Sequence, residues 1–164
     1  MKKIIFFFLI INISFAYAEQ NIYFLDLDYL LNNSNKGKII INKLKDIDQA
    51  NTSKLRNEEK QIKELENEIS TKKNVISEEE IQNKIKILRS KFDKYKIEKK
   101  KSIKEFNSIK ETELKNFFRE ITPYIEEFME KKSIKIILDK KNIFIANSNY
   151  DITSELIDFL NSKK

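Results

Sequence analysis

The residues of this chain that could do chemistry are mostly lysines, and they gather in one stretch. Between Lys84 and Lys104 ten residues are basic and two are acidic, which leaves a net charge of +8. Such a cluster attracts an acidic partner, because long-range attraction raises the rate of encounter and salt weakens it. Each lysine alone is more simply a solvated helix residue, but the cluster as a whole favours a contact surface. Its members are Lys84, Lys86, Arg89, Lys91, Lys94, Lys96, Lys99, Lys100, Lys101 and Lys104.

Other kinds of chemistry have little support in the sequence. There is no Cys and no His, so thiol chemistry, the commonest general base and the commonest metal ligand are missing. Carboxylates are numerous, but no motif pairs them in a pocket, and no phosphate-binding loop is present. We therefore expect that the protein is not an enzyme and that it has no catalytic residue, no metal site and no cofactor. No nucleic-acid recognition motif is present either, so DNA binding would be non-specific and sensitive to salt.

Apolar residues follow the same stretch at helical spacing. Phe92, Tyr95 and Phe106 are more simply interpreted as the seam between two helices than as a partner-binding surface. Ile97 and Phe118 fall off that seam. These two are the better candidates for a lining that touches a partner.

These residues need a long helical element to position them, and residues 36–121 provide it. The chain has one Gly and one Pro, so it has few turns. An apolar residue recurs every seven positions, as in a coiled-coil seam, at Leu55, Ile62, Ile69 and Ile76. Polar residues occupy other positions of this seam, at Asp48, Asn51 and Glu58. So polar a seam cannot hold a tight coil along its whole length.

A helix boundary lies near the middle of this element. Ser77 and Glu80 form an S-x-x-E capping box, and three glutamates occupy the first turn that follows. One helix therefore ends near Ile76 and another begins after Ser77. Two helices of about 40 residues, each about 60 Å long, favour an antiparallel hairpin. The alternative is one continuous parallel coiled coil.

The flanking segments, 19–35 and 122–164, predict a small β-rich body. Strands are expected at Ile22–Asp26, Ile134–Leu138 and Ile143–Ala146, with a turn between the last two. Asp151 is expected to cap a final helix, Ile152–Leu160. About 60 residues are at the margin of what one core can stabilise alone, and apolar strand edges invite pairing. We therefore expect an obligate homo-oligomer whose shared body includes Ile22, Phe24, Ile136, Leu138, Ile143 and Ile145.

The first 18 residues have the pattern of an export signal. Two lysines precede an apolar run that is too short to span a bilayer, and Ala16-Tyr17-Ala18 is a cleavage site. Cleavage after Ala18 would give an exported protein that begins at Glu19. The alternative is an uncleaved membrane anchor.

Three quoted segments carry a resemblance to a known family. The chain begins its body with "IYFLD", continues with "LLNNSNKGK" before the long helices, and ends with "IILDKKNIFIANSNYDITSELIDFL". Over the whole length after the signal it resembles the Skp/OmpH family of periplasmic chaperones. The resemblance implies an α+β fold, predominantly α. In it, three chains form a homotrimer with a β-barrel-like body, from which helical hairpins project around a cavity.

The resemblance also implies a function. Members of the family hold unfolded outer membrane β-barrel proteins in that cavity without ATP, so the protein would work in the periplasm. The basic stretch would then contact acidic clients, anionic lipid or lipopolysaccharide. The alternative function is a structural coiled-coil protein of the envelope, a spacer without chaperone activity.

Overall fold

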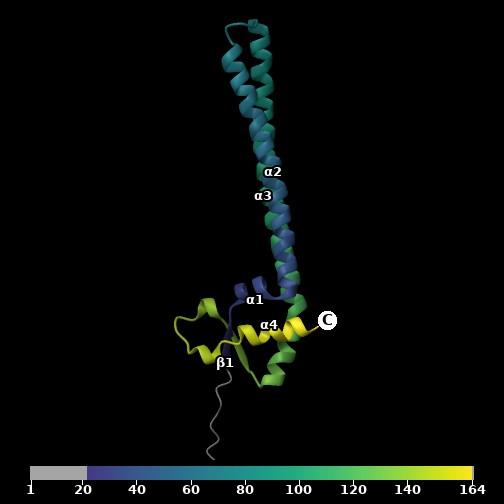
Figure 1. The fold of residues 1–164 in the computed structure, drawn as a ribbon, viewed down its shortest axis with the longest axis vertical. Helices are drawn as coiled ribbons and strands as arrows, with labels where there is room; N and C mark the ends of the chain where they lie inside the picture. The colour runs from purple at the N-terminus through teal and green to yellow at the C-terminus, as the bar shows by residue number, and fades with distance from the viewer. Residues whose placement is uncertain (1–21, 164) are drawn as a thin grey trace, which may run out of the picture.

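The structure is a computed structural model that describes residues 22–163. The predicted signal and its cleavage site at Ala18 lie outside the described residues. Two long helices lie side by side as a narrow arm, and the remaining elements form a body at one end of it (Figure 1). In chain order the elements are β1 (Ile22–Leu25), α1 (Leu27–Asn33), α2 (Asn35–Lys72), α3 (Glu78–Lys132), β2 (Ile136–Asp139), the 3-10 helices η2 (Lys140–Asn142) and η3 (Ser148–Tyr150), and α4 (Thr153–Ser162).

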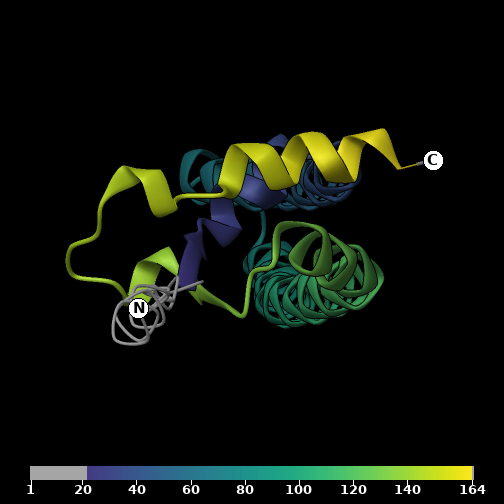
Figure 2. The ribbon, with the colours of Figure 1, turned by 90° about the horizontal axis from the view of Figure 1, so that it is seen from below.

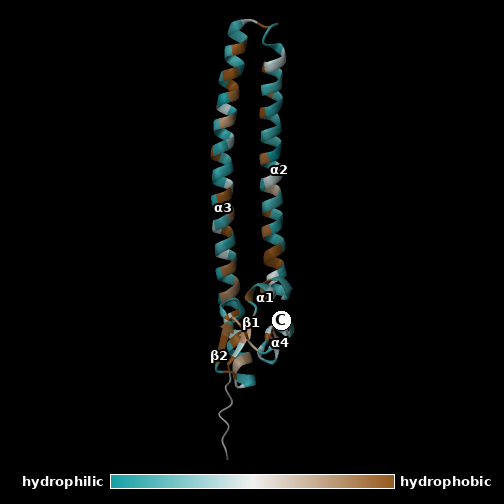
Figure 3. Ribbon diagram, turned by 90° about the vertical axis from the view of Figure 1, so that its left-hand side faces the viewer, coloured by the Kyte–Doolittle hydropathy of each residue, from teal (hydrophilic) through white to brown (hydrophobic). Residues whose placement is uncertain are grey.

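The arm is the antiparallel hairpin that the capping box predicts. Helix α2 ends at Lys72, four residues before the expected Ile76, and α3 begins at Glu78. The Ser77 hydroxyl accepts a hydrogen bond from the Glu80 backbone N–H at 3.2 Å, which satisfies one free donor of the first turn of α3. Figure 3 shows the two helices running the length of the arm, with a connection at the end far from the body. A continuous parallel coil is thereby ruled out.

A tight corner joins the body to the arm. The Asp26 carboxylate accepts from the Tyr29 N–H at the start of α1, and the Ser34 hydroxyl accepts from the Gly37 N–H at the start of α2. Gly37 is needed at this corner because a Cβ atom there would lie 1.9 Å from the Leu31 carbonyl oxygen. The first turn of α2 can therefore pack against the last turn of α1.

The body closes around the lower end of α3. Ser133 adopts a left-handed conformation (φ 55°), and the Ile134 N–H returns to the Met129 carbonyl, which ends α3 and reverses the chain. As a result β2 runs parallel to β1, with Ile22 opposite Ile136. Helix α4 crosses the base of the arm (Figures 1 and 2). The core between these elements contains Leu25, Leu30, Phe117, Ile121, Phe128, Ile134, Ile152, Leu156, Ile157 and Leu160.

One predicted strand is wrong: residues 143–146 form no strand in the described chain. Asp139 instead caps the short helix η2. Ile143 and Asn147 have extended backbones, but Phe144 lies at a bend, and residues 143–147 pair with no neighbouring strand. A ladder needs a second backbone, and β1 already pairs with β2 on one side. Asp151 accepts from the Thr153 N–H at 3.0 Å, so it stabilises the start of α4, although the residue in the cap position is Ile152.

Candidate functional site

The ten basic residues of the predicted cluster lie together on the upper half of α3. Among the residues that the structure describes, only two of them form an ion pair: Lys84 with Glu68 at 3.1 Å, and Lys101 with Glu105 at 3.8 Å. Lys91 donates to the Gln61 side-chain oxygen at 3.2 Å. Most of the positive charge is therefore not neutralised by neighbouring carboxylates of residues 22–163.

Two ammonium groups of the cluster lie over aromatic rings. The Lys96 ammonium lies 4.4 Å from the centre of the Phe92 ring, and the Lys99 ammonium 5.9 Å from that of Tyr95. A cation over an aromatic face is attracted by the ring quadrupole, an interaction of roughly 0.5–1 kcal/mol at exposed sites. These lysines thus cover apolar surface with their stems while the charged ends stay in water.

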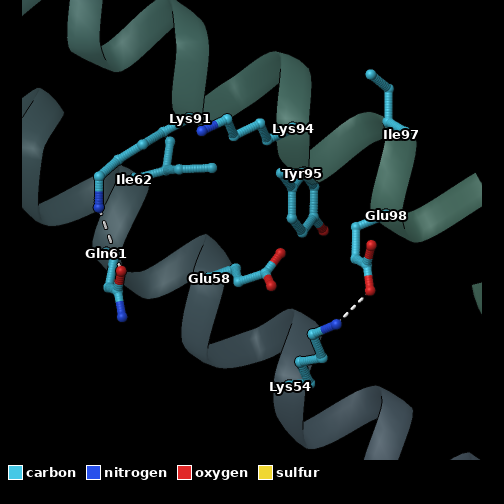
Figure 4. A pocket seen from close by; sticks show the side chains of 9 residues that line it. All are labelled: Lys54, Glu58, Gln61, Ile62, Lys91, Lys94, Tyr95, Ile97 and Glu98. Carbon is cyan, nitrogen blue, oxygen red and sulfur yellow. Dashed lines mark hydrogen bonds and ion pairs between the residues drawn. The ribbon is translucent and has the colours of Figure 1, made fainter.

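The two residues predicted to line a partner surface lie in different surroundings. Ile97 is 68% exposed and points away from α2 (Figure 4). Helical spacing puts Asp93, Lys94 and Lys100 beside it, so it is an apolar residue within a mostly basic face. Phe118 is half-buried instead and meets Phe117 edge to face, with ring centres 5.3 Å apart. Phe118 packs against the body core, which leaves Ile97 as the freer of the two.

Ion pairs join the two helices of the arm. Lys36 pairs with Glu120, Lys43 with Glu113 at 2.7 Å, and Lys54 with Glu98. The hydrogen bond from Lys54 lowers the pKa of the Glu98 carboxyl, and the same bond raises the pKa of Lys54. In these three pairs α2 supplies the lysine and α3 the glutamate. Near the tip α2 supplies the carboxylate instead: Glu68 accepts hydrogen bonds from Lys72 of its own helix and from Lys84 of α3, and both bonds lower the pKa of Glu68.

The polar seam positions open the arm. Glu58 lines a groove of about 410 Å³ between α2 and α3, together with Ile62 and Tyr95 (Figure 4). Asp48 and Asn51 line a second groove of about 210 Å³ nearer the body. Sequence reasoning predicted the weak seam but not the grooves. Polar residues at seam positions were the available signal for the grooves. The volume of each groove could not be predicted from them, because it depends on how closely the two helices approach each other.

A third groove lies on the body. It has a volume of about 390 Å³, and five of the six residues predicted for the shared body line it: Ile22, Phe24, Leu138, Ile143 and Ile145. The sixth, Ile136, is exposed beside Ile22 in the sheet. Sequence reasoning did not single out Phe144, whose side chain is fully exposed, or Tyr150, which also lines the groove. The continuous apolar run Ile143-Phe144-Ile145 was the available signal.

Residues 22–163 contain no group of three or more His, Cys, Asp or Glu side chains arranged to hold a metal ion. None of the helices in the same range is long and apolar enough to cross a membrane.

The fold and these surfaces define a class: proteins with a long helical hairpin on a small α+β body. The sequence pattern of outer membrane proteins of the OmpH-like type matches residues 21–160, so the chain belongs to the OmpH-like family. A crystal structure from Caulobacter crescentus CB15, of a protein proposed to be an OmpH-like outer membrane chaperone, has the same fold. It superposes with a TM-score of 0.74 at 19% identity, over 90% of this chain and 87% of that one. No curated protein matches the sequence.

Proposed function

We propose that this protein is an ATP-independent periplasmic chaperone that holds unfolded outer membrane β-barrel proteins between helical arms and prevents their aggregation. The observation that carries the proposal is the surface of the arm. It exposes large apolar side chains on both helices, among them Ile39 on α2 and Ile87 and Ile97 on α3, the helix that also carries the basic cluster. Membership of the OmpH-like family and the fold shared with the Caulobacter crescentus protein support it.

Contacts of this kind suit a holdase. Single exposed apolar residues separated by lysines offer many weak contacts and no deep pocket, so a bound chain can later leave. The uncompensated charge at Lys86, Arg89 and Lys100 would attract acidic unfolded chains over long range. Anionic lipid or lipopolysaccharide presents the same charge, and contact with either is part of the proposal.

We propose further that three copies share one body. The supporting observation is the apolar groove on the body, which is lined in part by Ile143 and Ile145 of the unpaired segment 143–147; the same segment carries the exposed Phe144. A strand edge with free backbone groups and apolar side chains is a template for pairing with another chain. A second copy would complete the strand that the single chain lacks at residues 143–146.

Light scattering coupled to gel filtration tests both parts. The protein beginning at Glu19 is measured alone and after dilution of a urea-unfolded outer membrane barrel protein into it. A trimer that carries the client in a soluble complex is the expected result. A helical monomer would contradict the shared body, and a trimer that lets the client aggregate would leave a structural role.

Deletion of the arm from Asn42 to Glu113 separates the chaperone from an envelope spacer. The shortened protein keeps the body core and should still assemble, but it should no longer keep the client soluble. A spacer would show no protection in the full-length protein either. Adding vesicles with and without anionic lipid to the full-length protein tests whether the basic cluster also meets a membrane surface.

A further inference from the structure

The groove around Glu58 exists because a charged residue occupies a core position of the arm. Leu44 and Ile62 fill their seam positions and are buried. Glu58 does not fill its position, because a carboxylate taken out of water without a partner is costly. It has no ion-pair partner within 4 Å among residues 22–163. The seam is therefore open on one side of the arm at this level.

The groove has an apolar floor and polar sides. Ile62, which is 6% exposed, and the ring of Tyr95 form the floor, and the Glu58 carboxylate faces the ring (Figure 4). The Lys54–Glu98 pair lies at one end, and the Lys91–Gln61 hydrogen bond at the other. A volume of about 410 Å³ falls in the range of small-ligand pockets, about 300–1,000 Å³, and is large enough for one aromatic side chain.

The polar groups narrow the choice of occupant. An aromatic ring that enters the groove would stack near Tyr95 and Ile62. The carboxylate of Glu58 accepts hydrogen bonds only, so it favours a ring with an N–H or O–H donor, which means tryptophan or tyrosine rather than phenylalanine. At the rim, Lys91 and Lys94 have no carboxylate within 4 Å among the described residues, so acidic neighbours of the ring would meet positive charge.

We propose that this groove binds a tryptophan or tyrosine side chain of an unfolded segment that carries acidic residues next to the ring. The inference rests on the proposed function and locates one specific client contact on the arm. It also fits the client class, because transmembrane β-barrels carry girdles of aromatic residues at both membrane interfaces.

Tryptophan fluorescence tests this directly, since the chain itself contains no Trp. The probe is a short Gly/Ser peptide with one Trp between two pairs of Asp. Its emission should shift to the blue on titration with the protein. Replacing Asp by Lys should weaken binding. In competition, the peptide with Phe in place of Trp should bind about five-fold more weakly, the equivalent of one lost hydrogen bond.

The decisive variant is Glu58→Leu. Leucine should fill the seam, raise the melting temperature of the arm and weaken the Trp peptide about five-fold or more, because groove and acceptor are both lost. Loss of binding in a more stable protein cannot come from unfolding. Glu58→Gln keeps an acceptor oxygen and should bind the peptide within about two-fold of the wild type.

Glu66→Leu is the matched control, since it adds the same side chain to an exposed position of α2 outside the groove. The proposal is overturned if Glu58→Leu binds the peptide as well as the wild type, if Glu66→Leu loses as much affinity, or if the Lys-flanked peptide binds better. Client aggregation is followed with the same proteins. If the wild type protects a client but Glu58→Leu binds the peptide unchanged, the proposed role of the groove is refuted and the proposed function is not. A wild type that binds the peptide but protects no client would refute the proposed function alone.

Discussion

The body and the arm bury their apolar residues to very different degrees. In the body, Leu30, Ile121 and Leu156 are wholly buried in a core built from helices and strands that lie far apart in the sequence. Between residues 42 and 113 of the arm, only Leu44, Ile62 and Ser102 are buried. Figure 3 shows the same contrast as a mostly hydrophilic arm above a body with apolar segments. Two helices can cover each other on one side only, so most apolar side chains of the arm remain at least partly exposed.

The largest expected effect is in the body core. Leu156→Ala should lower the free energy of unfolding by about 2–5 kcal/mol, the usual range for a buried leucine. The matched arm variant is Leu65→Ala, at a half-buried seam position, and it should cost less because part of the site already faces water. Urea unfolding followed by circular dichroism at one protein concentration measures both. Equal losses would mean that the arm is as well packed as the body.

Gly37→Ala tests the corner that joins the two regions. Alanine normally stabilises a helix relative to glycine, by about 1 kcal/mol. Here its Cβ would overlap the Leu31 carbonyl, so α1 and α2 must move apart, and we expect a net loss of roughly 1–3 kcal/mol. The neighbouring, exposed Lys38→Ala is the control and should have little effect. A Gly37→Ala protein as stable as the wild type would show that the corner yields freely.

The arm could be predicted from the sequence far better than the body. Helix periodicity, the Ser77 cap and the polar seam residues are local signals, and each has a counterpart in the structure: the hairpin, its boundary and the two grooves. The strand expected at residues 143–146 failed because a local pattern shows that a segment suits a sheet but cannot supply its partner. Phe118 is a similar case. Its spacing places it off the arm seam, but spacing cannot reveal that the body core reaches it.

Acid should affect the body through Asp151. Burial raises the pKa of this carboxyl, but hydrogen bonds from Thr153 and Lys140 outweigh it, so the pKa lies below its usual 3.8. The folded state therefore gains stability from the ionised carboxylate above pH 3.8, and this gain is lost as the pH falls through the lowered pKa. Asp151→Asn should destabilise the protein at pH 7, and this difference should shrink as the pH falls below 3.8.

Urea unfolding at several pH values between 7 and 3 measures this difference. Asp158→Asn, at an exposed position of α4, is the control and should show no comparable trend. If the free energies of unfolding of the wild type and Asp151→Asn differ by the same amount at every pH, the loss of stability comes from the changed shape of the side chain and not from its charge.

The smallest effect should come from the ion pairs that join the helices of the arm. A double-mutant cycle on Lys43 and Glu113 should give a coupling free energy of about 1 kcal/mol or less, because the lysine is largely exposed. The body pair Lys163–Glu127 should couple more strongly, since its lysine is more buried and the pKa of Glu127 is lowered by Lys131 and Lys163. Half-molar salt should weaken the arm pair most. A stronger coupling in the arm would mean that charge, and not the half-filled seam, holds the hairpin closed. A weak coupling would imply that lysines of the arm can leave the carboxylates of their own chain and pair with those of a partner at little cost in folding stability.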